Sequence, residues 1–231
     1  MTSPTVLITG ASRGIGREVA RVLLADGWHV IAGVRDPATA PPRTQVETVD
    51  MADARSIDAL AQRLRERDQR IDVLVNNAGI YRAGNRELWN VNVLGPLRLT
   101  RALAPLLARG GKVVMVTSGL GQRSAQSAAL VKRLSDPTLN LDALEKLAME
   151  APGGYGASKA ALNVMARLFA AALRPRAILV NAVSPGWART DMGGAGAPLS
   201  VEEGAASVLW AVKLPPDGPT GGVFEHGRPM E

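Results

Sequence analysis

One short segment near the start of the chain constrains the fold more than any other. An apolar, β-branched run, TVLIT at 5–9, is followed by the glycine-rich turn GASRGIG at 10–16 and then by apolar residues at helical spacing. Glycine permits a tight turn and a close approach of backbone to a ligand, and a helix N-terminus offers free N–H groups to an anion. Such turns also occur as plain connections, but strand, glycine turn and helix in this order are typical of nucleotide-binding α/β folds.

The composition fits a globular protein. Hydrophobic residues make up 46% of the 231 residues and charged residues 21%, so we expect a single domain over residues 1–231. The absence of cysteine excludes disulfides, thiolate catalysis and thiolate metal sites. No apolar run reaches the ~18 residues of a membrane helix, and no basic and apolar leader opens the sequence. We therefore expect a cytoplasmic protein with no membrane partner.

The formal net charge of +6 raises the question of nucleic acid. The arginines are scattered, however, and the only tight group is Arg63, Arg65, Arg67 and Arg70, in a chain with few aromatic residues to stack on bases. We interpret this group as a solvated helix face and expect no nucleic-acid partner. A positive field would still attract an anionic cofactor.

The strongest candidate for chemistry is a tyrosine and a lysine in GYGASK, at 154–159. Tyr155 and Lys159 are four residues apart, so on a helix they lie on one face, one turn apart. A free phenol has a pKa of about 10 and transfers protons poorly at neutral pH, but a nearby ammonium favours the phenolate and lowers that pKa. Such pairs also arise by chance, so the neighbouring motifs decide whether this one is functional.

Three further motifs follow apolar runs that have the length of buried strands. NNAG at 76–79 follows the run 71–75, Ser118 ends the next run, and SPGWART at 184–190 follows a third. Ligands of open α/β sheets bind at the carboxyl ends of the strands. We therefore expect these motifs to lie together, at the same edge of the sheet as the first glycine turn.

The order and spacing of TGxxxGxG, NNAG, YxxxK and PGxxxT resemble the short-chain dehydrogenase/reductase family, and the resemblance covers essentially the whole chain. It implies an α/β fold: a doubly wound, Rossmann-like, seven-stranded parallel sheet of strand order 3-2-1-4-5-6-7, with helices on both faces. It also implies reversible hydride transfer between a nicotinamide cofactor and a carbonyl or alcohol.

The resemblance assigns four catalytic residues. Tyr155 is expected to act as general acid/base on the developing alkoxide, Ser118 to hydrogen-bond the same oxygen, and Lys159 to lower the pKa of Tyr155 and hold the nicotinamide ribose. Asn92 matches the asparagine that kinks a helix and helps hold a water on the proton path to Lys159. Asn90 is a competing candidate for this role, because the stretch before it is shorter than in the family.

The resemblance also implies a set of cofactor-binding residues. Val34 stands where an acid usually holds the ribose of NAD, and Arg35 follows it. Arg35 and Arg13 suit a 2′-phosphate, so NADP(H) is expected in preference to NAD(H), although the carboxylate of Asp36 suits a ribose. The full predicted set is Gly10, Ser12, Arg13, Gly14, Ile15, Gly16, Arg35, Asp50, Met51, Asn77, Ala78, Gly79, Tyr155, Lys159, Pro185, Gly186, Ala188 and Thr190.

More residues separate Ser118 from Tyr155 than a simple crossover needs. Leucines at helical spacing on either side of Asp136-Pro137 predict helices there, and we interpret residues 120–153 as a helical insertion. Such an insertion resembles the carbonyl-reductase branch of the family, where it can obstruct the usual subunit interface. A monomer or a homo-oligomer, with monomer or dimer favoured, is therefore expected. A plain core-covering helix explains the leucines equally well.

The expected substrate is a small carbonyl or alcohol compound, held by apolar side chains. Tyr81, Leu120, Trp187 and Met192 are candidates for lining such a pocket, and the glycine-rich stretch 191–198 predicts a mobile lid over it. The reaction expected from these features is the reduction of an apolar aldehyde or ketone.

A second interpretation is a non-catalytic NADP(H)-binding regulator or scaffold, which would need only the cofactor contacts. The intact Ser118, Tyr155 and Lys159 argue against it. His29 and His226 lack the spacing of metal ligands, so we expect structural roles for both and no metal site.

Overall fold

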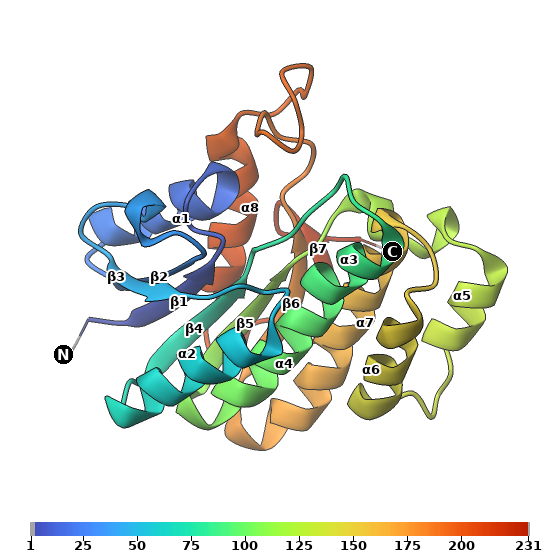
Figure 1. Cartoon of the computed structure of the whole chain (residues 1–231), viewed down its shortest axis with the longest axis horizontal. Coiled ribbons are helices and arrows are strands. Elements are labelled where there is room, and N and C mark those ends of the chain that lie inside the picture. The colour runs from blue at the N-terminus through green and yellow to red at the C-terminus, as the bar shows by residue number, and fades with distance from the viewer. Residues whose placement is uncertain (1–2, 231) are drawn as a thin grey trace.

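The computed structural model describes residues 3–230 and contains one sheet of eight strands in the order β3-β2-β1-β4-β5-β6-β7-β8 (Figure 1). The first seven strands pair in parallel, and β8 runs antiparallel to β7. The strands are β1 (Thr5–Thr9), β2 (His29–Val34), β3 (Gln45–Thr48), β4 (Ile71–Asn76), β5 (Leu107–Val116), β6 (Leu179–Ser184), β7 (Val223–Glu225) and β8 (Arg228–Pro229).

Helices cover both faces of the sheet, as Figure 1 shows. α1 and α8 pack side by side on one face, and α2, α4 and α7 lie on the other. The helices are α1 (Gly14–Ala25), α2 (Ala54–Glu66), α3 (Asn85–Trp89), α4 (Gly95–Leu103), α5 (Ala128–Leu134), α6 (Leu141–Glu150), α7 (Tyr155–Leu173) and α8 (Val201–Val212), with a π-helical segment, Asn90–Leu94, between α3 and α4.

The central strands are buried on both faces. In β1, Leu7 packs into the core under α2, α4 and α7, whereas Val6 and Ile8 pack into the core under α1 and α8. Alternate side chains of a strand point to opposite faces, so a strand covered on both sides must be apolar throughout. The parallel arrangement brings the carboxyl ends of β1, β4, β5 and β6 to one edge of the sheet, where the predicted site motifs follow.

The predicted strand order is confirmed for seven strands, but the eighth strand was missed. β8 has only two residues, too few to carry a periodic signal. His226 and Gly227, with φ of 48° and 74°, form the tight turn that joins it to β7. Two successive residues with positive φ are typical of two-residue β-hairpin loops, and Gly227 favours that conformation. The sheet therefore ends in a short hairpin rather than in a parallel strand.

Two helices, α5 and α6, lie in the segment that was expected to be a helical insertion. Both contact α7, and Figure 1 shows them beyond it, away from β1. Arg101 of α4 anchors α6 through two ion pairs of 2.5 Å, one with Asp142 and one with Glu145. The interpretation of the segment as an insertion relative to the family, and of the chain as one domain, stays a prediction.

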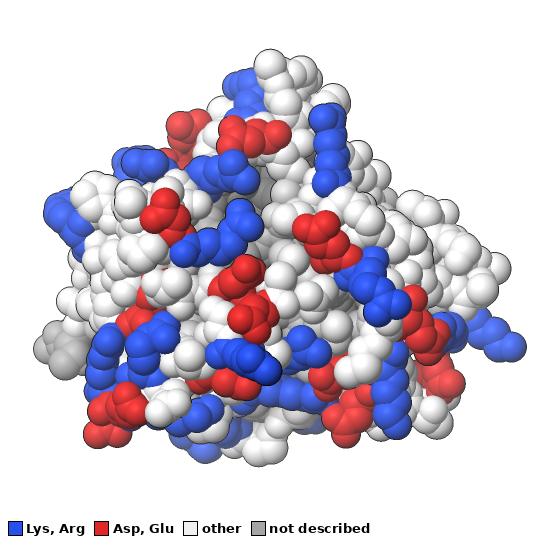
Figure 2. Space-filling view, viewed as in Figure 1, with Lys and Arg blue, Asp and Glu red and all other residues white. Residues whose placement is uncertain are grey.

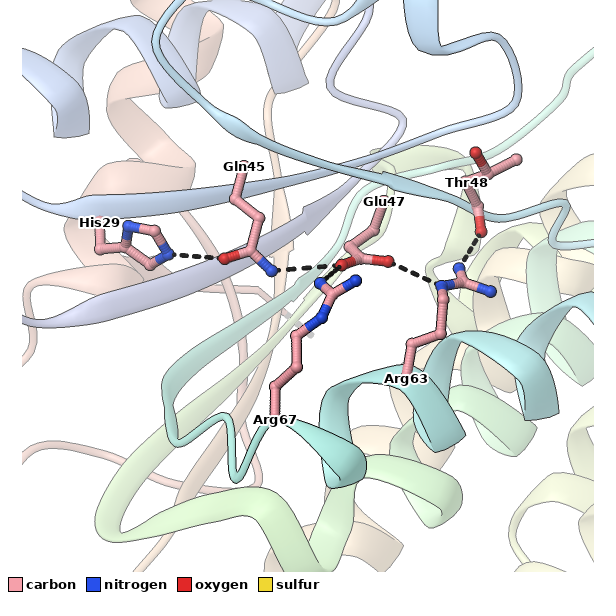
Figure 3. A network of polar contacts seen from close by, with 6 residues as sticks. All are labelled: His29, Gln45, Glu47, Thr48, Arg63 and Arg67. Carbon is pink, nitrogen blue, oxygen red and sulfur yellow. Dashed lines mark hydrogen bonds and ion pairs between the residues drawn. The ribbon is translucent and has the colours of Figure 1, made fainter.

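The arginine group on and after α2 is largely exposed, as predicted for a solvated face, but its side chains also have specific partners. Arg63 and Arg67 both bond to the buried carboxylate of Glu47 on β3, at 3.0 and 2.5 Å (Figure 3). The other two arginines also have partners, the carbonyl oxygen of Ala102 for Arg65 and the carboxylate of Asp72 for Arg70. These partners could not be predicted, because spacing along a helix reveals which residues share a face but not which acceptors the neighbouring elements offer them.

Within residues 3–230, none of the helices combines the length and the hydrophobicity that spanning a membrane requires. The same residues contain no group of three or more His, Cys, Asp or Glu side chains that could hold a metal ion. His29 instead shares a 3.0 Å hydrogen bond with Gln45, next to Glu47 (Figure 3).

Candidate active site

The glycine turn between β1 and α1 forms a cradle of backbone atoms. Gly10 has a φ of 67°, and a Cβ there would lie 2.9 Å from the Cα of Ala78. A Cβ on Gly16 would lie 2.5 Å from the carbonyl oxygen of Gly10, so only glycine lets α1 close on the turn. No side chain within residues 3–230 caps the N-terminus of α1. Its N–H groups and partial positive charge therefore remain available to an anion.

The same turn contacts the loop that follows β6. A Cβ on Gly14, whose φ is 52°, would lie 3.2 Å from the Cγ2 atom of Thr190. Ile15 packs toward α8, where a Cβ on Gly204 would lie 2.7 Å from its Cδ1 atom. Two of the predicted cofactor segments, far apart in the sequence, are thus brought together.

Asn77 and Ala78 brace β4 against β1. The Asn77 side chain donates to the carbonyl oxygens of Thr9, at 2.9 Å, and of Gly10, at 3.1 Å. The Thr9 hydroxyl in turn accepts the backbone N–H groups of Asn77 and Ala78, both at 3.1 Å. These bonds fix the NNAG segment beside the glycine turn, as the resemblance implies.

The two arginines expected to bind a 2′-phosphate, Arg13 and Arg35, are both exposed. Arg13 forms an ion pair with Asp191, with 3.0 Å between Nη1 and Oδ2. Arg35 directly follows β2 and makes no ion pair within residues 3–230. The carboxylate of Asp36, the competing ribose ligand, accepts the backbone N–H of Ala38 at 3.0 Å and so caps a short turn.

Asp50 and Met51 follow β3, at the adenine end that the resemblance implies. Asp50 accepts the backbone N–H of Ala52 at 2.9 Å, and Met51 is buried against Gly95 at the start of α4. Asn90 belongs to this neighbourhood, because its side-chain amide donates to the carbonyl oxygen of Ala52 at 2.8 Å. Its position does not support the competing role of Asn90 on a proton path.

Asn92 lies in the π-helical segment and faces the catalytic side. Its side chain forms two 2.9 Å hydrogen bonds with the backbone N–H and carbonyl oxygen of Ile80, and donates to the Ser158 hydroxyl at 3.2 Å. A Cβ on Gly79 would lie 3.2 Å from the Oδ1 atom of Asn92 and 3.6 Å from the Nζ atom of Lys159. Asn92 and Lys159 therefore face the same small space beside Gly79.

Lys159 is a buried cation on α7. Only 4% of the residue is exposed, and its Nζ atom donates to the carbonyl oxygen of Val116 at 2.8 Å. Burial lowers the pKa of Lys159 to about 8, because a charged amine loses its hydration there. At pH 7 the side chain is still mostly an ammonium.

Tyr155 begins α7, with its ring 5.6 Å from the Nζ atom of Lys159. Burial raises the pKa of Tyr155 to about 12, while a hydrogen bond from the Ser118 hydroxyl opposes this rise and Tyr81 adds to it. The structure thus differs from the predicted acidification by Lys159. The physical reason is that removing the phenol from water outweighs the effect of an ammonium that is bonded to Val116 instead of to the phenol oxygen.

Ser118 lies two residues after β5, in the turn that faces the start of α7. Its Oγ atom accepts the backbone N–H of Leu120 at 3.3 Å, which leaves the hydroxyl hydrogen free to be donated elsewhere. Ser118, Tyr155 and Lys159 are thus brought together at the carboxyl end of β5, beside Gly79.

The loop after β6 is held by its own backbone. Gly186 has a φ of 71°, and its N–H donates to the Ser184 hydroxyl at 3.1 Å. The predicted lid, residues 191–198, follows Thr190, whose hydroxyl accepts the N–H of Gly193 at 3.0 Å. Ala188 pairs with Leu199 across the base of the lid. Pro185 completes the loop, with its carbonyl oxygen near Gly204 of α8.

Apolar side chains surround the Tyr155 hydroxyl. Tyr81 packs edge to face on Tyr155, with ring centroids 4.9 Å apart, and the Met192 sulfur is 4.0 Å from the Tyr155 hydroxyl. Leu120 and Trp187, the other predicted pocket residues, are more than half exposed. Figure 2 shows a hollow in this face of the molecule below the protruding loop, with both basic and acidic side chains around it. Tyr81 and Met192 thus give the surroundings of the Tyr155 hydroxyl an apolar character.

Sequence reasoning missed two supporting hydroxyls, those of Thr9 and Ser158. Thr9 bonds to the NNAG backbone, and Ser158 is fully buried between Asn92 and the carbonyl oxygen of Tyr155. A signal existed for both, because each lies inside a motif, TG for Thr9 and YxxxK for Ser158. Only the fold reveals which partner each hydroxyl meets.

Comparison with known proteins agrees with this geometry. A family model described as short chain dehydrogenase matches residues 4–130, and one described as enoyl-(acyl carrier protein) reductase matches residues 138–208. Carbonyl reductase (NADPH) 1 of Sus scrofa is 33% identical over 274 aligned positions, which cover 97% of this chain and 95% of that protein.

Solved structures are similar over the whole length. An NADPH-bound carbonyl reductase from chicken fatty liver superposes with a TM-score of 0.78 at 26% identity, covering 100% of this chain and 94% of that one. Salutaridine reductase from Papaver somniferum has a TM-score of 0.86 at 22% identity, covering 96% and 99%, and shows the likeness of fold. With a family model over more than half of its length and relatives that match from end to end, the chain belongs to the short-chain dehydrogenase/reductase family.

Proposed function

We propose that the protein catalyses the NADPH-dependent, reversible reduction of a small aldehyde or ketone, with Tyr155 as general acid/base. The observation that carries the proposal is the convergence of Ser118, Tyr155 and Lys159 beside a backbone cradle for a dinucleotide. The pig and chicken relatives, both named as carbonyl reductases and both associated with NADPH, support the cofactor and the reaction class.

The residues on the cofactor side fit NADP(H). Side chains on Gly10 and Gly16 would fill the cradle, the N-terminus of α1 faces it without a side-chain cap, and Arg13 and Arg35 are exposed. The α1 terminus suits a pyrophosphate, and the arginines suit a 2′-phosphate. When bound, the reduced nicotinamide supplies the hydride, and the protein supplies geometry and the proton.

Tyr155 is suited to donate that proton. With a pKa of about 12, its phenol is fully protonated at neutral pH, the state that reduction requires. Ser118 carries a free hydroxyl hydrogen beside it, so both groups can bond to the carbonyl oxygen as it gains negative charge. The reverse reaction needs the phenolate, so alcohol oxidation is expected to increase toward alkaline pH.

Lys159 and Asn92 extend the site inward. The Lys159 ammonium stabilises the phenolate that remains after proton transfer, and the space beside Gly79 that it shares with Asn92 suits a path for replacing the proton. The apolar character that Tyr81 and Met192 give to the surroundings of Tyr155 favours an apolar substrate.

The test is oxidation of NADPH with a panel of aldehydes and ketones, repeated with NADH. Turnover with NADPH and a lower kcat/KM with NADH are expected. Tyr155→Phe should keep NADPH binding and lose turnover by at least 100-fold, since positioned proton transfer contributes ~10²–10⁴-fold. Tight NADPH binding with no turnover on any carbonyl would point instead to the regulator or scaffold, and near-normal turnover by Tyr155→Phe would remove its assigned role.

A further inference from the structure

The turn that carries Ser118 lies directly on the first turns of α7. A Cβ on Gly121 would be 2.8 Å from the carbonyl carbon of Lys159, and a Cβ on Gly156 would be 2.7 Å from the carbonyl oxygen of Leu120. Real Cβ atoms do not approach so closely, so two glycines on opposite sides of the contact allow backbone to meet backbone. The distance between Ser118 and Tyr155 therefore depends on how this turn sits on α7.

One side chain holds the turn in place from above. The Nε2 atom of Gln126 donates to the carbonyl oxygen of Leu120 at 2.8 Å and to that of Gln122 at 3.0 Å. These two bonds use both hydrogens of the amide nitrogen. The same nitrogen is 3.4 Å from a Cβ built on Gly156, so the Gln126 amide lies over the start of α7 and over the turn together.

Leu120 links this clamp to the catalytic hydroxyl. Its carbonyl oxygen is held by Gln126, and its backbone N–H donates to the Oγ atom of Ser118 at 3.3 Å. As long as that N–H occupies the Ser118 oxygen, the hydroxyl hydrogen is directed to another acceptor, such as the oxygen of Tyr155 or of a substrate. The orientation of the Ser118 hydroxyl is thus set through the backbone of Leu120.

We propose that Gln126 is a positioning residue for catalysis: by clamping Leu120 and Gln122 it fixes the Ser118 hydroxyl toward Tyr155 and the substrate oxygen. This inference rests on the proposed function. It gives the segment between Ser118 and Tyr155 a role in the reaction, because Gln126 belongs to that segment. Gln126 acts through the backbone, since its amide bonds to the carbonyl oxygens of Leu120 and Gln122.

Asn163 of α7 also holds the turn, so the loosening of Leu120 can be separated from detachment of the whole turn. Its side chain donates to the carbonyl oxygen of Gly121 at 3.2 Å, from α7. With Asn163 and the glycine contacts in place, removal of Gln126 should loosen Leu120 without detaching the whole turn. The expected defect is therefore in the chemical step and not in folding.

The experiment compares Gln126→Met, which keeps the length of the side chain and lacks N–H donors, with Gln126→Lys, which keeps donors. Gln62→Met is the matched control, because Gln62 lies on the exposed side of α2 and bonds only to Glu66 within residues 3–230. We expect kcat of Gln126→Met to fall about tenfold, which corresponds to about 1.4 kcal/mol, with an unchanged Kd for NADPH. Gln126→Lys should lose less, and Gln62→Met nothing.

A second readout is the pH dependence of alcohol oxidation with NADP+. The hydrogen bond from Ser118 lowers the pKa of Tyr155, so a misdirected Ser118 should move the midpoint of the oxidation profile to higher pH in Gln126→Met. A purely structural role would lower the amount of active enzyme and leave the midpoint in place.

The outcomes separate this inference from the proposed function. If the wild type reduces carbonyls but Gln126→Met has the same kcat and pH midpoint, the positioning role is wrong and the function stands. A fall in kcat without any shift of the midpoint, accompanied by a lower melting temperature, also overturns the role. If the wild type turns over no carbonyl, the proposed function itself fails.

Discussion

Two buried charges in this molecule have opposite surroundings. The side chain of Glu47 on β3 is 2% exposed and meets Arg63, Arg67 and Gln45 (Figure 3). Burial alone would raise the pKa of Glu47, but the hydrogen bonds and the positive charge of these partners bring it below its usual value. Lys159 is 4% exposed, pairs with no carboxylate within residues 3–230, and has its pKa lowered to about 8 by burial.

The contrast separates a charge compensated by partners within the fold from one that, in the proposed function, takes part in the reaction. At the sheet edge, counter-charges compensate the desolvation of Glu47, as stability requires. At the carboxyl end of β5, the Lys159 ammonium donates to the carbonyl oxygen of Val116 and has no carboxylate partner within residues 3–230. Ionisable groups whose pKa is strongly shifted by burial are typical of functional sites. The following predictions test the contrast, beginning with the largest effect.

Turnover should separate the two charges most clearly. In the proposed function the Lys159 ammonium stabilises the Tyr155 phenolate that forms on proton transfer. Lys159→Met removes this ammonium, and kcat for carbonyl reduction should therefore fall by at least 100-fold. Glu47→Gln, on the far edge of the sheet, should keep its kcat per folded molecule. The measurement is steady-state kinetics with NADPH on both proteins, and a Lys159→Met enzyme with more than a tenth of the wild-type kcat would contradict the contrast.

Stability at pH 7 should respond in the opposite sense. Glu47→Gln leaves two guanidiniums without their shared carboxylate, and its free energy of unfolding should fall by about 3 kcal/mol, the low end for a broken buried pair because both arginines are partly exposed. Lys159→Met removes an uncompensated charge and should be at least as stable as the wild type. Urea unfolding measures both, with the exposed Glu66→Gln as control. An equal loss of unfolding free energy in Glu47→Gln and Lys159→Met would show that the two buried charges do not differ in their effect on stability.

Raising the pH should remove the positive charge of Lys159 and with it the free-energy cost of burying that charge. The unfolded lysine titrates near 10.5 and the folded one near 8, so between these values the unfolded chain binds more protons and stability rises with pH. From pH 8 to 10 this amounts to about 2 kcal/mol as an upper bound. The wild type should therefore gain stability relative to Lys159→Met over this range, and parallel pH profiles would show that folding does not lower the pKa of Lys159. Tyr155 contributes only above pH 10, where its raised pKa makes stability fall.

Acid should produce the smallest effect, at Glu47. Its folded pKa lies below the unfolded value of 4.5, so its stabilising contribution is complete above that pH and disappears as the pH falls through the folded pKa. The difference in unfolding free energy between wild type and Glu47→Gln should shrink as the pH is lowered from 5 toward 3. A difference that stays constant over this range would mean that folding does not shift the pKa of Glu47.

The parts of the structure that depend on local pattern could be predicted from the sequence. Apolar runs of strand length indicated parallel strands buried on both faces, and the resemblance to the family implied seven of them in the order that the structure shows. The places of Ser118, Tyr155 and Asn77 followed from motifs at strand and helix ends. β8 was missed because two residues carry no period.

Properties that depend on long-range side-chain contacts could not be predicted. Arg13 and Asp191 are 178 residues apart, and nothing in either segment indicates their ion pair. The pKa of Tyr155 depends on how deeply the fold buries the phenol, which the spacing of YxxxK does not determine. Motifs thus identified which residues meet, while burial decided their charge.

The π-helical segment Asn90–Leu94 makes the chain length at this point critical. A π turn contains one residue more than an α turn, and each residue advances an α-helix by about 100°. Deleting a single residue between Trp89 and Asn92 would let the helix run on regularly, yet it would rotate Asn92 away from Ile80 and Ser158 by more than a quarter turn. A shortened chain would thus have a more regular backbone but an Asn92 displaced from its partners, so the site constrains the number of residues at this point.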